Sequence, residues 1–144
     1  MTDRRKSKIY FFFEKPTTLG SRTKLKKFIE NIFKREGKRL QAINFIFCSD
    51  EYLRAINKNY LKHDYYTDIV TFQLSKGGKP IEGEIYISID RIAENALSFR
   101  ESRKREVHRV IIHGALHLCG YKDRLKAEKK EMSEKEEFYL KSYF

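Results

Sequence analysis

The sequence predicts an α/β fold of the α+β type: a single domain in which a mixed four-stranded sheet is packed with about five helices. Its 144 residues, 40% of them hydrophobic, are typical of one globular domain. Short β-rich runs and segments of helical periodicity follow one another in the order β-α-β-α-β-β-α-α-α. Because no repeat or break in composition divides the chain, we expect one domain over 1–144.

The first part of the chain supplies a strand, a helix and a second strand. A β-rich aromatic run over 9–13 predicts the first strand. Apolar residues recur at helical spacing over 25–33, with Lys and Arg on the opposite side. An amphipathic helix is therefore expected there, before the stop signal Gly37. Alternating apolar residues over 42–48 predict a half-buried strand.

The middle of the chain supplies a short helix and two strands. Ser49 or Asp50 can cap a helix that reaches Tyr60. Strand-like runs over 69–72 and 84–88 flank a Gly-Gly-Lys-Pro turn. These two neighbouring strands are expected to form a hairpin, which makes the sheet mixed.

Three helices are expected in the last part of the chain. Asp90 can cap the first of them, and Ser102 can cap the second. The second helix is apolar enough to be central to the core, and it carries His113 and His117. The third helix, over 125–140, is highly charged and has i,i+4 ion pairs that stabilise an exposed helix.

The most specific chemical signal is the pair His113 and His117, followed by Gly120 and Asp123. Two histidines four residues apart lie on one face of a helix. Glycine permits a left-handed turn after the helix, so Asp123 can fold back under His117. Three protein ligands with an open fourth position are typical of hydrolytic metal sites. We therefore expect His113, His117 and Asp123 to hold one divalent ion.

The same stretch leaves alternatives open. Two helical histidines and a loop carboxylate also occur in proteins without a metal. Cys119 or His63 could approach the cluster as a further ligand. His108 is instead expected to pack or to lie at the surface. The spacing also matches metzincin-type proteases, which carry a Glu as general base directly after the first histidine. That position is Gly114 here, which disfavours peptide hydrolysis.

The net charge of +11 is concentrated near the N-terminus. Residues 1–40 hold 13 of the 31 Lys and Arg but only 4 of the 20 Asp and Glu. This excess is typical of binding to a polyanion such as RNA, although a solvated helix face gives the same pattern. Two isolated cysteines, short apolar runs and no cleavable leader predict a cytoplasmic protein without a signal peptide or membrane span.

Three stretches resemble the YbeY family of endoribonucleases. The family signature HGxLHLxGYDH is similar to the sequence from His113 to Asp123. A second stretch, LNxxYRxxDxPTDVLSF, is similar to residues 56–72, and the strand GDIxIS is similar to residues 83–88. The three stretches occur in the family's order, and the chain is identified as a member on this basis.

The resemblance implies a zinc-dependent endoribonuclease that cleaves single-stranded RNA. It also implies a role in 16S ribosomal RNA 3′-end maturation and ribosome quality control. The implied partner is ribosomal RNA in the small ribosomal subunit, and neither DNA nor a membrane is expected. The alternative is a ribosome-associated RNA-binding assembly factor with weak or no nuclease activity. A metzincin-like metalloprotease is the third hypothesis.

Two residues depart from the family pattern. Asp123 stands where the family has its third histidine, and its carboxylate makes the site more hospitable to harder ions such as Mn²⁺. Leu61 stands where the family has an arginine. Lys62, next to it, is a candidate to contact a phosphate as a point charge.

Further residues are candidates for catalysis and RNA binding. Asp64 and Asp68 can each accept a hydrogen bond from a metal-bound histidine or cap their loop. Tyr65 and Tyr66 can stack on bases or pack in the core. Basic residues of the first helix are expected to follow the RNA backbone, namely Lys24, Lys27, Lys34 and Arg35.

Overall fold

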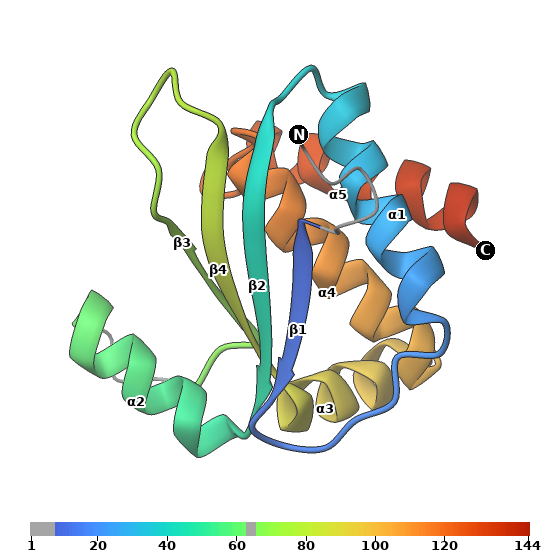
Figure 1. Cartoon of the computed structure of the whole chain (residues 1–144). Coiled ribbons are helices and arrows are strands. Elements are labelled where there is room, and N and C mark those ends of the chain that lie inside the picture. The colour runs from blue at the N-terminus through green and yellow to red at the C-terminus, as the bar shows by residue number, and fades with distance from the viewer. Residues whose placement is uncertain (1–7, 63–65) are drawn as a thin grey trace.

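The computed structural model describes residues 8–62 and 66–144 (Figure 1). The order of elements predicted from the sequence is confirmed. These elements are β1 (Ile9–Phe13), α1 (Arg22–Arg35), β2 (Leu40–Cys48), α2 (Asp50–Leu61), β3 (Ile69–Gln73), β4 (Ile81–Ser88), α3 (Ile89–Phe99), α4 (Arg103–Leu118) and α5 (Lys126–Tyr143).

The four strands form one mixed sheet in the order β1-β2-β4-β3. β1, β2 and β4 run parallel, while β3 pairs antiparallel with β4 in the predicted hairpin. β4 begins before the expected residue 84, because Ile81 and Gly83 still pair with Leu40 and Ile43 of β2. β3 is left at one edge of the sheet, where the side chains of α4 can reach it.

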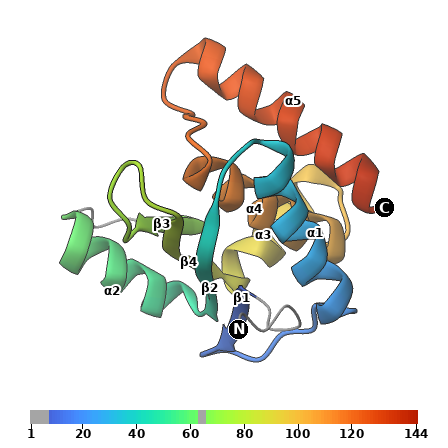
Figure 2. The ribbon, with the colours of Figure 1, turned by 45° about the horizontal axis from the view of Figure 1, so that its top comes forward.

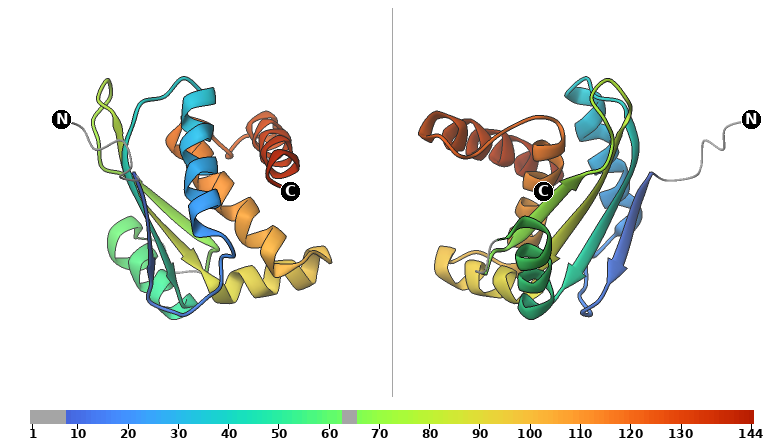
Figure 3. Two further views of the ribbon diagram at one scale, coloured as in Figure 1. Left: turned by 45° about the vertical axis from the view of Figure 1, so that its right-hand side comes forward. Right: turned by 90° about the vertical axis from the view of Figure 1, so that its left-hand side faces the viewer.

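Helices lie on both faces of this sheet (Figure 3). α1 and α4 cover one face, over a core in which Ile29, Phe45, Ile85 and Ile111 are fully buried. α5 packs against α4 and α1 through a second apolar cluster, and Figure 2 shows it farthest from the sheet. α2 covers the other face beside β3. Within the described residues, no helix combines the length and apolar character needed to cross a bilayer.

Two glycines let α4 lie close to the sheet. A Cβ on Gly114 would lie 2.9 Å from Ile69 Cδ1 and 3.0 Å from two atoms of Ile85. A Cβ on Gly83 of β4 would lie 2.8 Å from Leu118 Cδ1. Carbon atoms in contact normally lie about 3.5–4.0 Å apart, so neither position has room for a side chain. This close packing holds the histidine-bearing helix against β3 and β4.

The helix caps follow the sequence prediction at two helices and depart from it at α3. Ser49 caps α2 and Ser102 caps α4. Ser88, rather than Asp90, caps α3, since its hydroxyl accepts the hydrogen bond from the third residue of the helix. The Asp90 carboxylate instead accepts a hydrogen bond from the backbone N–H of Asp50 at 2.8 Å, which joins the start of α3 to that of α2.

Candidate metal centre

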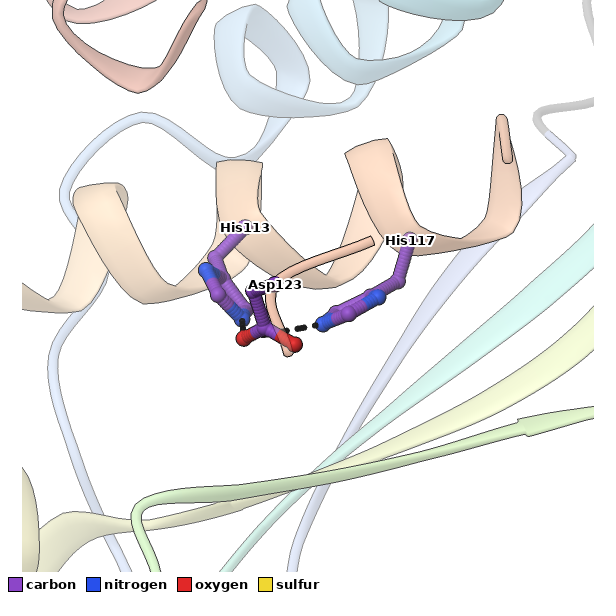
Figure 4. Close-up of side chains that lie close together, drawn as sticks. All are labelled: His113, His117 and Asp123. Atoms are coloured by element: carbon purple, nitrogen blue, oxygen red, sulfur yellow. Dashed lines mark ion pairs between the residues drawn. The ribbon is translucent and has the colours of Figure 1, made fainter. Parts of the chain in front are cut away.

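The side chains of His113, His117 and Asp123 converge below α4 (Figure 4). Oδ2 of Asp123 lies 3.2 Å from Nε2 of His113 and 3.4 Å from Nε2 of His117. One potential ligand atom from each residue lies within 4.8 Å of the others. Ligand atoms bound about 2.1 Å from a tetrahedral zinc ion lie about 3.4 Å apart. The three side chains therefore fit one small divalent ion.

The turn after α4 brings Asp123 back to the histidines. Gly120 has a φ of 108°, in the left-handed region that favours glycine. The backbone N–H of Tyr121 donates to the carbonyl of Leu116 at 3.0 Å, which closes the turn. The Tyr121 hydroxyl donates to Glu36 at 2.7 Å and thereby ties the turn to the end of α1. The fold-back of Asp123 that the sequence predicts is present.

A carboxylate from α5 contacts the other ring nitrogen of His113. Oε2 of Glu136 lies 2.5 Å from Nδ1 of His113, and Glu136 is only 6% exposed. The second oxygen of Glu136 accepts a hydrogen bond from Arg109 at 3.1 Å. Arg109 also donates to Glu106 through Nε at 2.8 Å and Nη2 at 2.7 Å. These bonds to Glu106, together with the charges of Glu106 and Glu136, raise the pKa of Arg109 above its usual value.

The cluster opens into a pocket of about 730 Å³. Among the described residues that line it, Arg109 is the one Lys or Arg. The remaining polar wall comes from α2, β3 and the segment before β3, and includes Asn57, Thr67, Asp68, Thr71 and Gln73. The pocket thus combines carboxylates and imidazoles with a single guanidinium.

The two residues predicted to assist catalysis differ in their distance from this pocket. Asp68 lines it, but its carboxylate accepts a hydrogen bond from Asn95 at 3.1 Å and lies 3.8 Å from Arg109. The carboxylate that contacts Nδ1 of His113 is that of Glu136 instead. Lys62 is exposed at the end of α2, where it has a left-handed backbone. A contact of Lys62 with substrate stays a prediction.

Among the other candidates from the same region, His63, Asp64 and Tyr65 lie outside the described residues. Tyr66 is 45% exposed and therefore does not belong to the core. The guanidinium groups of Arg54 and Arg91 lie 4.9 Å and 5.3 Å from the centre of its ring. Stacking of an RNA base on Tyr66 stays a prediction.

The basic residues of α1 lie away from the pocket. α1 contacts β1 and α4, and none of the described lining residues belongs to it. Lys24 donates to the backbone carbonyl of Tyr143 at 3.2 Å, and the Arg35 guanidinium lies 5.1 Å from the centre of the Phe138 ring. Both therefore lie against α5, and these two residues are exposed, as are Lys27 and Lys34. RNA binding by these four residues stays a prediction.

Two further candidate ligands lie outside the cluster. Cys119 is buried, and burial raises the pKa of its thiol to about 12. The thiolate form that binds metals is therefore disfavoured. His108 is buried as well, with Nδ1 2.6 Å from the carbonyl oxygen of Lys104 and its ring 4.8 Å from that of Tyr143. Of the two roles expected for His108, packing or a surface position, the structure shows packing.

Known proteins match this chain over nearly its whole length. The profile described as Endoribonuclease YbeY matches residues 13–144. The chain belongs to the YbeY family of endoribonucleases. A family relative from Cytophaga hutchinsonii, named Endoribonuclease YbeY, is 46% identical over 137 residues, which cover 94% of this chain and 96% of the relative. Another, from Christiangramia forsetii, is 45% identical and covers 92% of each chain.

The family assignment extends to the fold. The solution structure of TM1509 from Thermotoga maritima aligns with a TM-score of 0.65 and 31% identity, over 94% of this chain and 88% of that one. The metzincin-like hypothesis is wrong for a member of the YbeY family. The physical reason against a metzincin-like protease lies at Gly114, where a side chain would clash with Ile69 and Ile85. A general base cannot occupy that position while α4 lies this close to the sheet.

Proposed function

We propose that His113, His117 and Asp123 hold the divalent ion of a metal-dependent endoribonuclease. The contacts of His113 carry this proposal. In the tautomer that donates Nδ1–H to the buried Glu136 at 2.5 Å, Nε2 of His113 presents a lone pair toward Asp123. Oδ2 of Asp123 lies 3.2 Å from Nε2. These two atoms therefore lie as close together as two ligands of one ion.

A third donor completes the candidate ligand set. Nε2 of His117 lies 3.4 Å from the same Asp123 oxygen, so one potential ligand atom from each of the three side chains lies within 4.8 Å of the others. Two imidazoles and one carboxylate suit Zn²⁺, and the carboxylate also admits Mn²⁺. When bound, the ion polarises a phosphoryl oxygen and stabilises the charge that develops on it. We propose Zn²⁺ as the resident ion, with Mn²⁺ as its substitute.

We infer that the pocket receives one phosphodiester of a single RNA strand. Arg109 lines the pocket and brings a positive charge to it, while its Nε, Nη1 and Nη2 atoms donate to Glu106 and Glu136. Residues with hydroxyl or amide side chains also line the pocket, namely Asn57, Thr67, Thr71 and Gln73. Such groups can bond to the ribose 2′-hydroxyl, which distinguishes RNA from DNA.

In the cell, we propose that residues 1–144 act as one nuclease domain in the cytoplasm. The proposed substrate is ribosomal RNA of the small subunit, at the 3′ end of 16S ribosomal RNA. Support comes from the resemblance of this chain to the YbeY family. It also comes from the excess of Lys and Arg over Asp and Glu in residues 1–40, which suits a polyanionic partner.

The deciding experiment is a cleavage assay on single-stranded RNA. Metal-free wild type, His117→Ala and the loop control Lys122→Ala are each assayed without metal and after addition of Zn²⁺ or Mn²⁺. Metal-dependent cleavage by wild type and the control, with a loss of at least about 1000-fold in His117→Ala, is expected from the several kcal/mol that a metal supplies. RNA binding with equal background cleavage in all three proteins would instead indicate an assembly factor.

A further inference from the structure

We propose that Glu136 is a positioning residue that determines which ring nitrogen of His113 faces the metal. The inference rests on the metal-dependent function proposed above and assigns a role to α5, a helix that contributes none of the three ligands. Glu136 reaches His113 from a position 23 residues further along the chain.

The contacts of Glu136 make it a hydrogen-bond acceptor on both oxygens. Oε2 lies 2.5 Å from Nδ1 of His113, and Oε1 accepts from Nη1 of Arg109 at 3.1 Å. As a carboxylate, Glu136 offers acceptors on both oxygens, one to Arg109 and one to His113. This geometry pairs Oε2 with a hydrogen on Nδ1 of His113. Nε2 is left as the lone-pair donor on the side of Asp123.

Arg109 is itself held in place, so Glu136 has a fixed partner. Glu106 is 1% exposed and accepts two hydrogen bonds from Arg109, through Nε at 2.8 Å and Nη2 at 2.7 Å. Paired bonds of this kind fix the plane of a guanidinium group. The chain of contacts begins at the buried Glu106 in the first turn of α4. It continues through Arg109 and Glu136 and ends at His113 in the pocket.

The packing of α5 explains how an acidic side chain comes to be buried there. Met132, Tyr139 and Leu140 lie on the same side of α5 as Glu136 and pack against Ile112 and Leu116 of α4 and Ile32 of α1. Burying a carboxylate on an apolar helix face costs free energy unless it is paired. An ion pair with Arg109 alone would satisfy that need, so the contact with His113 has to be tested separately.

His113 and His117 differ in the contacts of their Nδ1 atoms. His113 has a 15% exposed side chain with the buried carboxylate on Nδ1, whereas the His117 side chain is 28% exposed. Within residues 8–62 and 66–144, no carboxylate contact is found on Nδ1 of His117. Hydrogen bonds to the remote nitrogen fix the orientation and basicity of a metal-bound imidazole. Glu136 therefore organises one histidine of the pair.

The test compares Glu136→Gln with Glu137→Gln, its neighbour on α5. Glu137 is 49% exposed and pairs with Arg105, so the control removes the same charge from the same helix. Nitrogen NMR of the metal-free protein reports the His113 tautomer, and competition with a chelator reports the Zn²⁺ dissociation constant. Because an amide both donates and accepts, the side chain introduced by Glu136→Gln no longer selects one tautomer.

We expect wild type and Glu137→Gln to show hydrogen on Nδ1 of His113. In Glu136→Gln we expect a mixed tautomer population and Zn²⁺ binding weakened by about 10- to 100-fold. The same tautomer and the same affinity in both variants would overturn the proposal. A wild type with hydrogen on Nε2 would also overturn it, and that measurement needs no variant to fold.

The same data separate this proposal from the proposed function. Wild type with hydrogen on Nδ1 but no measurable Zn²⁺ binding would support the positioning of His113 while contradicting the metal-dependent nuclease. Zn²⁺ binding unaffected by Glu136→Gln, with an unchanged tautomer, would leave the nuclease in place and remove the role of Glu136. Glu136→Asp, which keeps the charge, is expected to restore part of the Nδ1-hydrogen population.

Discussion

The pocket beside α4 and the outer face of α1 carry opposite charge and differ in packing. The pocket is walled by Asp68, Asp123 and two histidines, with Arg109 already paired to buried carboxylates. The outer face of α1 presents Lys27 and Lys34 to solvent. The pocket alone repels a phosphate until it holds a cation, whereas the α1 face attracts one at any time. The proposed capture and the proposed cleavage of RNA thus fall in separate regions.

The two regions also differ in how much change they tolerate. The pocket depends on the contact between α4 and the sheet, where no Cβ fits at Gly114. On α1, Leu25, Ile29, Ile32 and Phe33 supply the buried face, and the opposite side is free of packing demands. Substitutions in the pocket region should therefore affect folding and metal binding, and those on the outer face of α1 should affect RNA affinity alone.

The largest effect is expected from Gly114→Glu, which installs the carboxylate that a metzincin would use. Its side chain would enter the contact with Ile69 and Ile85. Overpacking together with a buried charge should lower the free energy of unfolding by at least about 3 kcal/mol. Denaturant unfolding measures it, with Asn31→Glu on the exposed face of α1 as the control. A stable Gly114→Glu protein with proteolytic activity would contradict the packing argument.

The next largest effect is expected at Asp123, the most exposed of the three proposed ligands. Asp123→Ala should weaken Zn²⁺ binding by at least about 100-fold, more than the loss of an outer hydrogen-bond partner costs. Asp123→His should retain Zn²⁺, bind Mn²⁺ less well than wild type and shift the pH–rate profile. Metal content by mass spectrometry and chelator competition measure both variants. Equal affinities in wild type and Asp123→Ala would show that the carboxylate does not touch the ion.

The convergence of His113, His117 and Asp123 could be predicted from sequence because its determinants are local. His113 and His117 share a helix face, and Gly120 reverses the chain within the same eleven residues. The strand over 9–13 was equally local, since its aromatic run has no competing helical periodicity. Such features need no knowledge of what packs against them.

Glu136 and Arg109 could not be predicted in the same way. They lie 27 residues apart, and their contact depends on how α5 crosses α4. The charge of α5 indicated an exposed helix, although Met132, Tyr139 and Leu140 mark a buried side. An acidic residue on that apolar side was the available signal. Likewise Asp90 was predicted to cap α3, but Ser88 caps it, and the Asp90 carboxylate accepts a hydrogen bond from the distant backbone N–H of Asp50.

The smallest effect is expected from charge reversal on α1. The double variant Lys27→Glu/Lys34→Glu should bind single-stranded RNA about 10-fold more weakly at low salt. The plot of log affinity against log salt should become shallower by about 1.4, since each lost phosphate contact removes about 0.7. Cleavage at saturating RNA should be unchanged, because neither side chain lines the pocket.

The matched control is Lys129→Glu/Lys130→Glu, which changes the net charge equally at exposed positions of α5. An equal loss of affinity in both double variants would mean that RNA responds to overall charge and that α1 has no special part. A loss confined to the α1 variant, seen in KM and absent from kcat, separates capture from chemistry. A fall in kcat would instead bring α1 into the catalytic step, and the division between the two regions would no longer hold.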